Sequence, residues 1–335
     1  MSGLGARMEA DMRVQPEVVG ALASGPRPLV REPQDGIVIV ARGSSDYAAI
    51  YGRYLLEAAT GRPVALAAPS LQTLYGVESR LSGWLAVGIS QSGRTPEIAT
   101  VLDRYKRAGA RTLAITNDPD SPLAHSADSS LALGAGEEGA VPATKTFTAQ
   151  LAAMALVAEA LGPVSWGEAD WERVPPAMEA VLGDFAAAER AAARLDGADE
   201  LVALGRGYLM PVALEAALKL REAARLRAEG WSAADFRHGP VTVAGADLPV
   251  LAVSAAGPAA ADVEELAGEA AGSGATVLRL ADDEHADLTY PGDMAEPLRA
   301  IPAALRAQQL ALALARRRGV DPDSPPGLRK VTPTR

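Results

Sequence analysis

The chain has 335 residues, 48% hydrophobic and 22% charged, a composition that can bury a large core and excludes disorder as its main state. Its 32 basic and 42 acidic residues give a net charge of −10, which does not attract nucleic acid or an anionic membrane at long range. With no cysteine and three histidines, the chain lacks disulfides, thiol nucleophiles and iron–sulfur clusters, and a histidine-rich metal site is not expected.

Residues 1–30 form an N-terminal segment of helical composition. It carries acidic residues where a signal peptide would have its apolar core. No apolar run approaches the ~18 residues of a membrane span. We therefore expect a cytoplasmic protein without a membrane partner.

Short strands alternate with helices through residues 31–165. Strands are expected at 37–41, 85–89, 112–116 and 130–133, and helices at 47–59, 96–108 and 144–161. Apolar runs this short suit buried parallel strands better than helices. The alternation predicts an α/β domain, with a parallel sheet covered by helices on both faces.

A second α/β domain is expected over residues 177–320, after a connection at 162–176. Its strands are expected at 201–204, 249–254 and 275–280, and its helices at 177–195, 210–228, 260–272 and 297–318. The strand–turn–helix runs that start at residues 37 and 201 look like two copies of one unit. Residues 321–335 form an extended, proline-containing tail.

A glycine-containing turn with three hydroxyl residues ends the strand at 85–89. Thr95 suits the N-cap and Pro96 the first position of the next helix, so free backbone N–H groups there can bind an anion such as phosphate. The alternative is a capped helix in which the hydroxyl groups only form hydrogen bonds within the turn and bind no ligand. A Walker A loop and a nucleophile elbow are excluded, because no Gly-Lys-Ser/Thr follows and Ser92 stands where the elbow needs glycine.

An acid–base pattern occurs in the second half. Glu215, Lys219 and Glu222 are spaced to share one face of a helix. That face is either an exposed row of salt bridges or, because apolar residues flank it, a partly buried pair suited to moving a proton. His238 precedes Gly-Pro and has either a structural role or one in proton transfer.

Together these motifs resemble the sugar isomerase (SIS) domain family. Residues 90–95 (SQSGRT) resemble its phosphate loop, and 142–150 (PATKTFTAQ) resemble the start of a following helix. Residues 213–222 with 238–240 (HGP) are similar to the second SIS domain in the isomerase half of glucosamine-6-phosphate synthases and in SIS-type glucosamine-6-phosphate deaminases. The tail at 328–332 resembles the segment that carries a catalytic lysine.

The resemblance implies two tandem SIS domains of doubly wound, flavodoxin-like architecture that act on a hexosamine or ketose 6-phosphate without metal or organic cofactor. It implies that the tail lies over the active site and that the protein is a homodimer. The implied phosphate-binding residues are Ser90, Gln91, Ser92 and Thr95, and the implied sugar-binding residues are Ser44, Ser45, Val141 and Ala143. The implied catalytic residues are Glu222 for proton transfer between C1 and C2, Lys219 to orient it, His238 of the neighbouring subunit for ring opening, and Lys330 over the carbonyl carbon.

Three functions follow from this resemblance. We expect no glutaminase domain, so the expected reaction is glucosamine 6-phosphate plus water to fructose 6-phosphate plus ammonia. Arg42 and Ala143 differ from the residues that the family usually has at these positions, which are expected to lie beside the sugar. These differences motivate the alternative of a fructosamine-6-phosphate deglycase. The third possibility is a regulatory module that binds a sugar phosphate without turnover.

Overall fold

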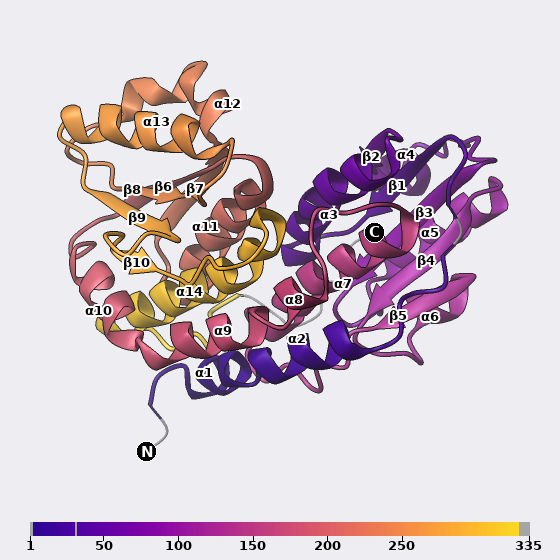
Figure 1. Ribbon diagram of the computed structural model, residues 1–335, viewed down its shortest axis with the longest axis horizontal. Helices are drawn as coiled ribbons and strands as arrows, with labels where there is room; N and C mark the ends of the chain where they lie inside the picture. Colours follow the sequence, from indigo (N-terminus) through magenta and orange to yellow (C-terminus); the bar gives the residue numbers. More distant parts are fainter. Residues whose placement is uncertain (1–2, 31, 328–335) are drawn as a thin grey trace. The chain divides into compact units, whose positions relative to one another are not determined.

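The computed structural model describes residues 3–30 and 32–327 (Figure 1). Its contacts divide the chain into two compact units, each with its own sheet. The N-terminal unit comprises residues 21–30, 32–137 and 146–165. The C-terminal unit comprises residues 3–20, 138–145 and 166–327.

The N-terminal unit has a five-stranded parallel sheet with strand order β2-β1-β3-β4-β5, which is the flavodoxin-like order. The strands are β1 (Gly36–Val40), β2 (Val64–Leu66), β3 (Trp84–Ser90), β4 (Arg111–Thr116) and β5 (Ser129–Ala132). The helices are α3 (Ser44–Thr60), α4 (Pro69–Thr73), α5 (Pro96–Arg107), α6 (Pro122–Ser126) and α7 (Lys145–Leu161). Helix α2 (Gln15–Ser24) and the first residue of α7 cross the unit boundary. The order reverses between β1 and β3, where sheets of this kind bind ligands.

Both faces of this sheet are apolar, as the continuous hydrophobic strands predict. Side chains alternate along a strand, so Val38 and Val40 face one side, where they share a cluster with residues of α5 and α6. Helix α3 packs against β1 and β3. Gly52 of α3 leaves no room for a side chain, since a Cβ there would lie 2.2 Å from Cε of Met154 in α7.

The C-terminal unit repeats the topology with the order β10-β9-β8-β6-β7, which is the same order counted from its own first strand. The strands are β6 (Glu200–Gly205), β7 (Arg227–Ser232), β8 (Val250–Val253), β9 (Val277–Ala281) and β10 (Leu288–Thr289). The helices are α1 (Ala6–Arg13), α8 (Glu168–Trp171), α9 (Val174–Gly183), α10 (Phe185–Ala193), α11 (Met210–Ala224), α12 (Ala233–Arg237), α13 (Ala260–Gly272) and α14 (Glu296–Arg317), with 3-10 turns η1 (Gly207–Leu209) and η2 (Pro240–Val243). The two similar strand–turn–helix runs are thus equivalent parts of two equivalent sheets.

Helices α12 and α13 cover one face of the second sheet, and α11 and α14 lie on the other (Figure 1). Most of α14 is buried. Helix α11 packs closely on the strands because glycine residues, which have no side chain, face it from the sheet. A Cβ on Gly230 of β7 would lie 2.6 Å from the backbone of Leu214, so no larger residue fits there.

Two predicted elements differ from the structure. The helix expected over 210–228 is wrong at its end: α11 stops at Ala224, Arg225 takes the left-handed conformation (φ 55°), and residues 227–232 form strand β7. The helix expected over 177–195 is two helices, because Asp184 accepts a hydrogen bond from the backbone of Ala187 and starts α10. In the first case pairing with β6 overrides helical composition.

Within residues 3–30 and 32–327, no helix combines the length and apolar character that crossing a membrane requires.

Candidate active site

The 90–95 turn of the N-terminal unit gathers hydroxyl groups at the start of α5. The hydroxyl of Ser90 accepts a hydrogen bond from the backbone of Gly93 (3.2 Å) and lies 3.4 Å from that of Thr95, and Ser92 accepts one from the backbone of Arg94 (3.2 Å). Gly93 has φ +62°, and a Cβ there would lie 2.1 Å from the hydroxyl of Ser121. Glycine is therefore required for the turn to take this shape.

A second loop leaves the same edge of the sheet beside this turn. Strands β1 and β3 are parallel neighbours, with Val40 opposite Gly88, so the loops that follow them are adjacent. Arg42 links the two loops by donating to both oxygens of buried Glu97, over 3.0 and 3.2 Å. In the first turn of α3, Ser44 is half-buried and Ser45 is buried.

The hydroxyl of Ser45 accepts a hydrogen bond from the side chain of Gln150 at 3.0 Å. The structure therefore brings Ser44, Ser45 and the 90–95 turn to one end of one sheet, at the point where the strand order reverses. Open α/β sheets bind ligands at this position.

In the C-terminal unit, the acidic and basic groups of α11 form a buried triad. The ammonium of Lys219 lies 3.4 Å from Glu215 and in closer contact with Glu222. The side chains of Lys219 and Glu215 are 1% exposed, whereas that of Glu222 is 19% exposed. The spacing of the three residues predicts their shared face, and burial distinguishes the structure from an exposed salt-bridge row.

The charge of Lys219 depends on its two partners. Burial alone would lower the pKa of the Lys219 ammonium, but the carboxylates of Glu215 and Glu222 outweigh that effect and raise it. The ammonium is therefore charged at neutral pH, and it is in direct contact with the Glu222 carboxylate.

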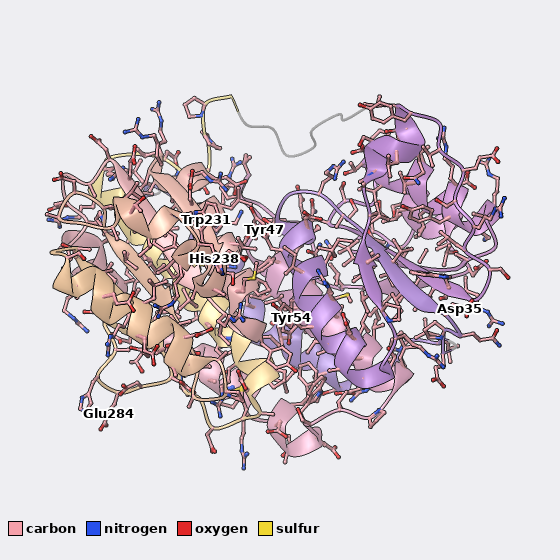
Figure 2. All side chains as sticks on the ribbon, turned by 90° about the horizontal axis from the view of Figure 1, so that it is seen from above. Asp35, Tyr47, Tyr54, Trp231, His238 and Glu284 are labelled. Atoms are coloured by element: carbon pink, nitrogen blue, oxygen red, sulfur yellow. The ribbon has the colours of Figure 1, made fainter. Side chains whose placement is uncertain are left out.

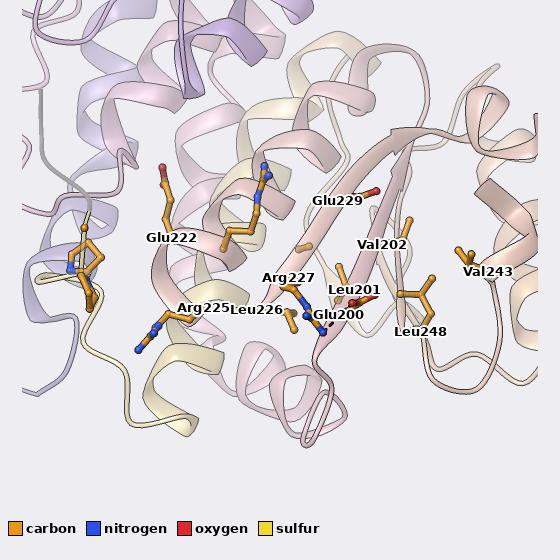
Figure 3. Close-up of a pocket in the computed structure, with 15 residues that line it drawn as sticks. Glu200, Leu201, Val202, Glu222, Arg225, Leu226, Arg227, Glu229, Val243 and Leu248 are labelled. Atoms are coloured by element: carbon orange, nitrogen blue, oxygen red, sulfur yellow. Dashed lines mark ion pairs between the residues drawn. The ribbon is translucent and has the colours of Figure 1, made fainter. Parts of the chain in front are cut away.

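Glu222 lines a cavity of about 790 Å³ in the same unit (Figure 3). Figure 3 shows Glu222 and Arg225 extending from the C-terminal end of α11 and the residue after it. The first residues of β6 and β7 and residues 325–327 also line the cavity. A carboxylate with limited exposure, backed by a buried ammonium and open to a cavity, is suited to take and return a proton.

Of the other two predicted catalytic residues, one is described by the structure, and it does not line this cavity. His238, labelled in Figure 2, is exposed directly after α12 and is not among the residues that line it. Gly239 follows with φ +150°, as expected for the turn. Lys330 lies outside the described residues.

Residues 138–145 hold Val141 and Ala143 half-buried between buried neighbours. Glu138 accepts hydrogen bonds from the backbone of Thr144 (3.0 Å) and of Lys145 (3.2 Å). These backbone amides lie at the start of α7, so the Glu138 carboxylate acts as its N-terminal cap.

Sequence reasoning did not assign a role to Asp11, Glu97 or Glu138, whose side chains are all buried. Glu97 has a local signal, because it lies in the first turn of α5, where an acidic side chain suits the helix dipole. Asp11 and Glu138 have no comparable local signal, because their partners are brought to them only when the chain packs.

The fold and these motifs define a protein with two SIS domains, and the SIS domain family model matches residues 32–160 and 195–294. The chain belongs to the SIS domain family.

Several characterised proteins are similar to this chain. It is 33% identical over 343 residues to the glutamine–fructose-6-phosphate aminotransferase [isomerizing] of Halobacterium salinarum, covering 98% of this chain and 55% of that protein. The chain thus spans about half the length of the curated relatives it matches.

Two solved structures share the fold. The C-terminal domain of glucosamine-fructose-6-phosphate aminotransferase from Francisella tularensis has a TM-score of 0.82 and 22% identity, covering 95% of this chain and 98% of that one. A glucosamine-6-phosphate deaminase from Thermotoga maritima has a TM-score of 0.80 and 24% identity, covering 98% and 100%.

Proposed function

We propose that the chain is a deaminase/isomerase that converts glucosamine 6-phosphate and water to fructose 6-phosphate and ammonia. The observation that carries this proposal is the triad of α11, in which Glu222 contacts the buried ammonium of Lys219 and opens onto a cavity. A protein that only binds a sugar phosphate needs an anion site, whereas an oriented and partly desolvated carboxylate is what a general base requires. The direction that releases ammonia requires no nitrogen donor.

In this proposal the phosphate binds at the 90–95 turn. Backbone N–H groups at the start of α5 and its helix dipole attract the anion, and the hydroxyls of Ser90, Ser92 and Thr95 complete its shell with Gln91. Ser44, Ser45, Val141 and Ala143 line the sugar. A site of this kind lets a chain of net charge −10 bind an anion without a basic surface.

Glu222 carries the proton. Once the ring is open, Glu222 removes the C2 hydrogen as a proton and leaves an enolamine, and the same carboxyl returns the proton to C1. Water then adds to the imine at C2 and ammonia leaves, so the atoms of substrate and water equal those of fructose 6-phosphate and ammonia. Lys219 orients Glu222 throughout, because its ammonium is buried against it.

Two further groups complete the proposal. We place Lys330 over the carbonyl carbon and assign ring opening to His238 from the partner of a homodimer. The exposure of His238, and its absence from the lining of the Glu222 cavity, support a role outside its own chain's cavity. We expect the protein to act in the cytoplasm, since a doubly charged sugar phosphate does not cross a bilayer unaided.

The direct test measures ammonia and fructose 6-phosphate formed from glucosamine 6-phosphate. Glu222→Gln is expected to lower kcat by about 10²–10⁴-fold, the usual contribution of a general base, while the Kd for a phosphate ester stays within about twofold. Gly93→Ala is expected to weaken that Kd at least about tenfold, since φ is positive and a Cβ meets Ser121.

Gly76→Ala is the matched control for the glycine. Gly76 has φ +63°, and a Cβ there meets nothing within 4 Å, so its substitution adds strain without a clash and the Kd is expected to stay within about twofold. Wild-type protein that releases no ammonia from any hexosamine phosphate would refute the proposal. Tight binding without turnover would instead identify a regulatory sugar-phosphate-binding protein.

A fructosamine-6-phosphate deglycase is the second candidate. Arg42 departs from the family pattern, and its guanidinium bridges the loop after β1 to Glu97 at the start of α5. In this proposal the bridge alters the part of the site that would contact the sugar. The bulkier amine of a fructosamine 6-phosphate would have to fit in that part. Comparison of kcat/KM for glucosamine 6-phosphate and a fructosamine 6-phosphate decides between the two reactions.

A further inference from the structure

The short helix α1 is capped by a residue from the far end of the chain. Its own N-cap residue is Gly5, which has no side chain to cap the helix. The carboxylate of Asp323 instead accepts hydrogen bonds from the backbone of Arg7 (2.8 Å) and Met8 (3.0 Å). Asp321 accepts one from the backbone of Gly5 (3.0 Å). The start of α1 is therefore joined to residues 321–323, which lie about seven residues before Lys330 in the sequence.

Near its C-terminal end, α1 binds the segment at residues 138–145 through the side chain of Asp11. One oxygen of Asp11 accepts a hydrogen bond from the backbone of Ala140 (2.8 Å), and the other lies 2.9 Å from the ammonium of Lys145. The side chains of Asp11 and Lys145 are 7% and 8% exposed. Ala140 precedes Val141, one of the residues proposed to line the sugar.

Helix α1 is also fixed to the core of its unit. Met8 and Met12 are buried, and a Cβ on Gly5 would lie 2.4 Å from Leu312 of α14. Arg316 of α14 pairs with Glu9 of α1. The helix can therefore transmit the position of one attached segment to the other.

We propose that α1 is a positioning element that holds residues 321–327 and the 138–145 segment as one body, with Asp323 and Asp11 as its positioning residues. The use of this body in catalysis rests on the proposed function, because Lys330 and Val141 are assigned there. The mechanical link itself rests on the hydrogen bonds and burial of α1 alone. Loss of the cap at one end is expected to loosen the segment at the other.

The test uses the full chain with Asp323→Ala, Asp323→Asn and Asp11→Asn. Asparagine is a good N-cap, so Asp323→Asn is the conservative variant that should restore what Asp323→Ala loses. Asp282→Asn is the matched control, because Asp282 is also 7% exposed, accepts from a backbone amide (Ala256, 2.8 Å) and pairs with a cation (Arg299, 2.7 Å) in the same unit. Within the described residues, the hydrogen bonds and ion pair of Asp282 join it to Ala256 and Arg299, which lie outside α1.

Hydrogen exchange of peptides over 138–145 tests the link. Asp323→Ala, which alters only the contact of α1 with residues 321–327, is expected to raise their exchange by about tenfold, while Asp323→Asn and Asp282→Asn leave it within about twofold. Unchanged exchange of this segment in Asp323→Ala overturns the link, whatever the enzymatic activity. An inactive wild type with linked exchange would refute the proposed function and leave the link standing.

Kinetics with glucosamine 6-phosphate test the catalytic use. Asp11→Asn is expected to raise KM about tenfold through the proposed sugar-lining segment. Asp323→Ala is expected to lower kcat about tenfold with KM within about twofold, because residues 321–327 lead along the chain to Lys330, the proposed catalytic lysine. Some variants could lower Tm as much as Asp282→Asn does and still keep the wild-type kcat and KM. That result would show that α1 contributes to stability alone and would overturn its catalytic role.

Discussion

At the scale of single residues, the proposed chemistry depends on a buried cation, Lys219, that contacts two carboxylates. Lys219 has 1% of its side chain exposed, and its pKa is raised by Glu215 and Glu222 against the opposing effect of burial. Removal of the ammonium takes from both carboxylates the counter-charge that Lys219 supplies in a largely desolvated place. Removing one partner of a buried ion pair typically lowers the free energy of unfolding by about 3–5 kcal/mol.

We therefore predict that Lys219→Met lowers the free energy of unfolding by about 3–5 kcal/mol and kcat by at least about a hundredfold. Leu218→Met, the neighbouring uncharged position, is the control and should cost under about 1.5 kcal/mol. Urea unfolding and steady-state kinetics measure both. A Lys219→Met protein that keeps full kcat would contradict the orienting role.

The raised pKa of Lys219 also fixes the sign of a pH effect. The folded protein holds this proton more tightly than the unfolded chain does, so the stabilisation is fully present below the unfolded pKa of about 10.4. It is lost as pH rises through the raised pKa in the folded state. Urea unfolding between pH 8 and 11 should show a fall in stability above about pH 10 that Lys219→Met partly removes; an equal fall in both proteins would assign the effect to other groups.

At the scale of elements, Glu222 is placed by the close packing of α11 on β7. Gly230 allows this approach, since a Cβ there would meet the backbone of Leu214 at 2.6 Å. Backbone atoms cannot move aside as the end of a flexible side chain can. The helix would have to shift, and Glu222 lies two turns further along it.

Gly230→Ala is accordingly expected to destabilise the protein by about 1–3 kcal/mol and to lower kcat about tenfold or more. Gly268→Ala is the matched control, because Gly268 lies inside α13 and a Cβ there meets nothing within 4 Å. It should stabilise the protein by about 0.4–1 kcal/mol and leave kcat unchanged. Thermal unfolding and kinetics compare the two, and an equal effect of both substitutions would refute the packing argument.

At the scale of the whole molecule, two sheets of one topology carry different groups. The loop after β3 offers Ser90, Ser92 and Thr95, whereas the equivalent loop after β8, residues 254–259 (SAAGPA), keeps one hydroxyl. The carboxylate of Glu296 lies against Gly257 in that second loop, where a Cβ would be 2.4 Å from its oxygen. An acidic group there repels phosphate, so one phosphate per chain is expected.

Mixed dimers test the proposed exchange of His238 between subunits. Glu222→Gln and His238→Ala proteins are each expected to be inactive alone. When they are unfolded and refolded together in equal amounts, about half of the dimers are mixed and each has one complete site, which restores about a quarter of the wild-type activity. No recovery in verified mixed dimers would place His238 and Glu222 in the same chain's site.

The α/β class, the 90–95 turn and the strands of both sheets except β2, β7 and β10 followed from local sequence. Each depends on spacing within about ten residues, such as apolar runs, an N-cap before proline, or the three- and four-residue steps of Glu215, Lys219 and Glu222. The strand at 227–232 was missed because pairing with β6, and not its composition, makes it a strand.

Tertiary structure alone decided which of these charges are buried and which distant residues they meet. Spacing places Lys219 on a face with two carboxylates, but only the packing of α11 against β7 and α14 removes that face from water. The cap that Asp323 provides for α1 joins residues 315 positions apart, and Asp11 meets Ala140 across 129. Periodicity encodes a local face, whereas partners at such separations exist only once the chain has folded.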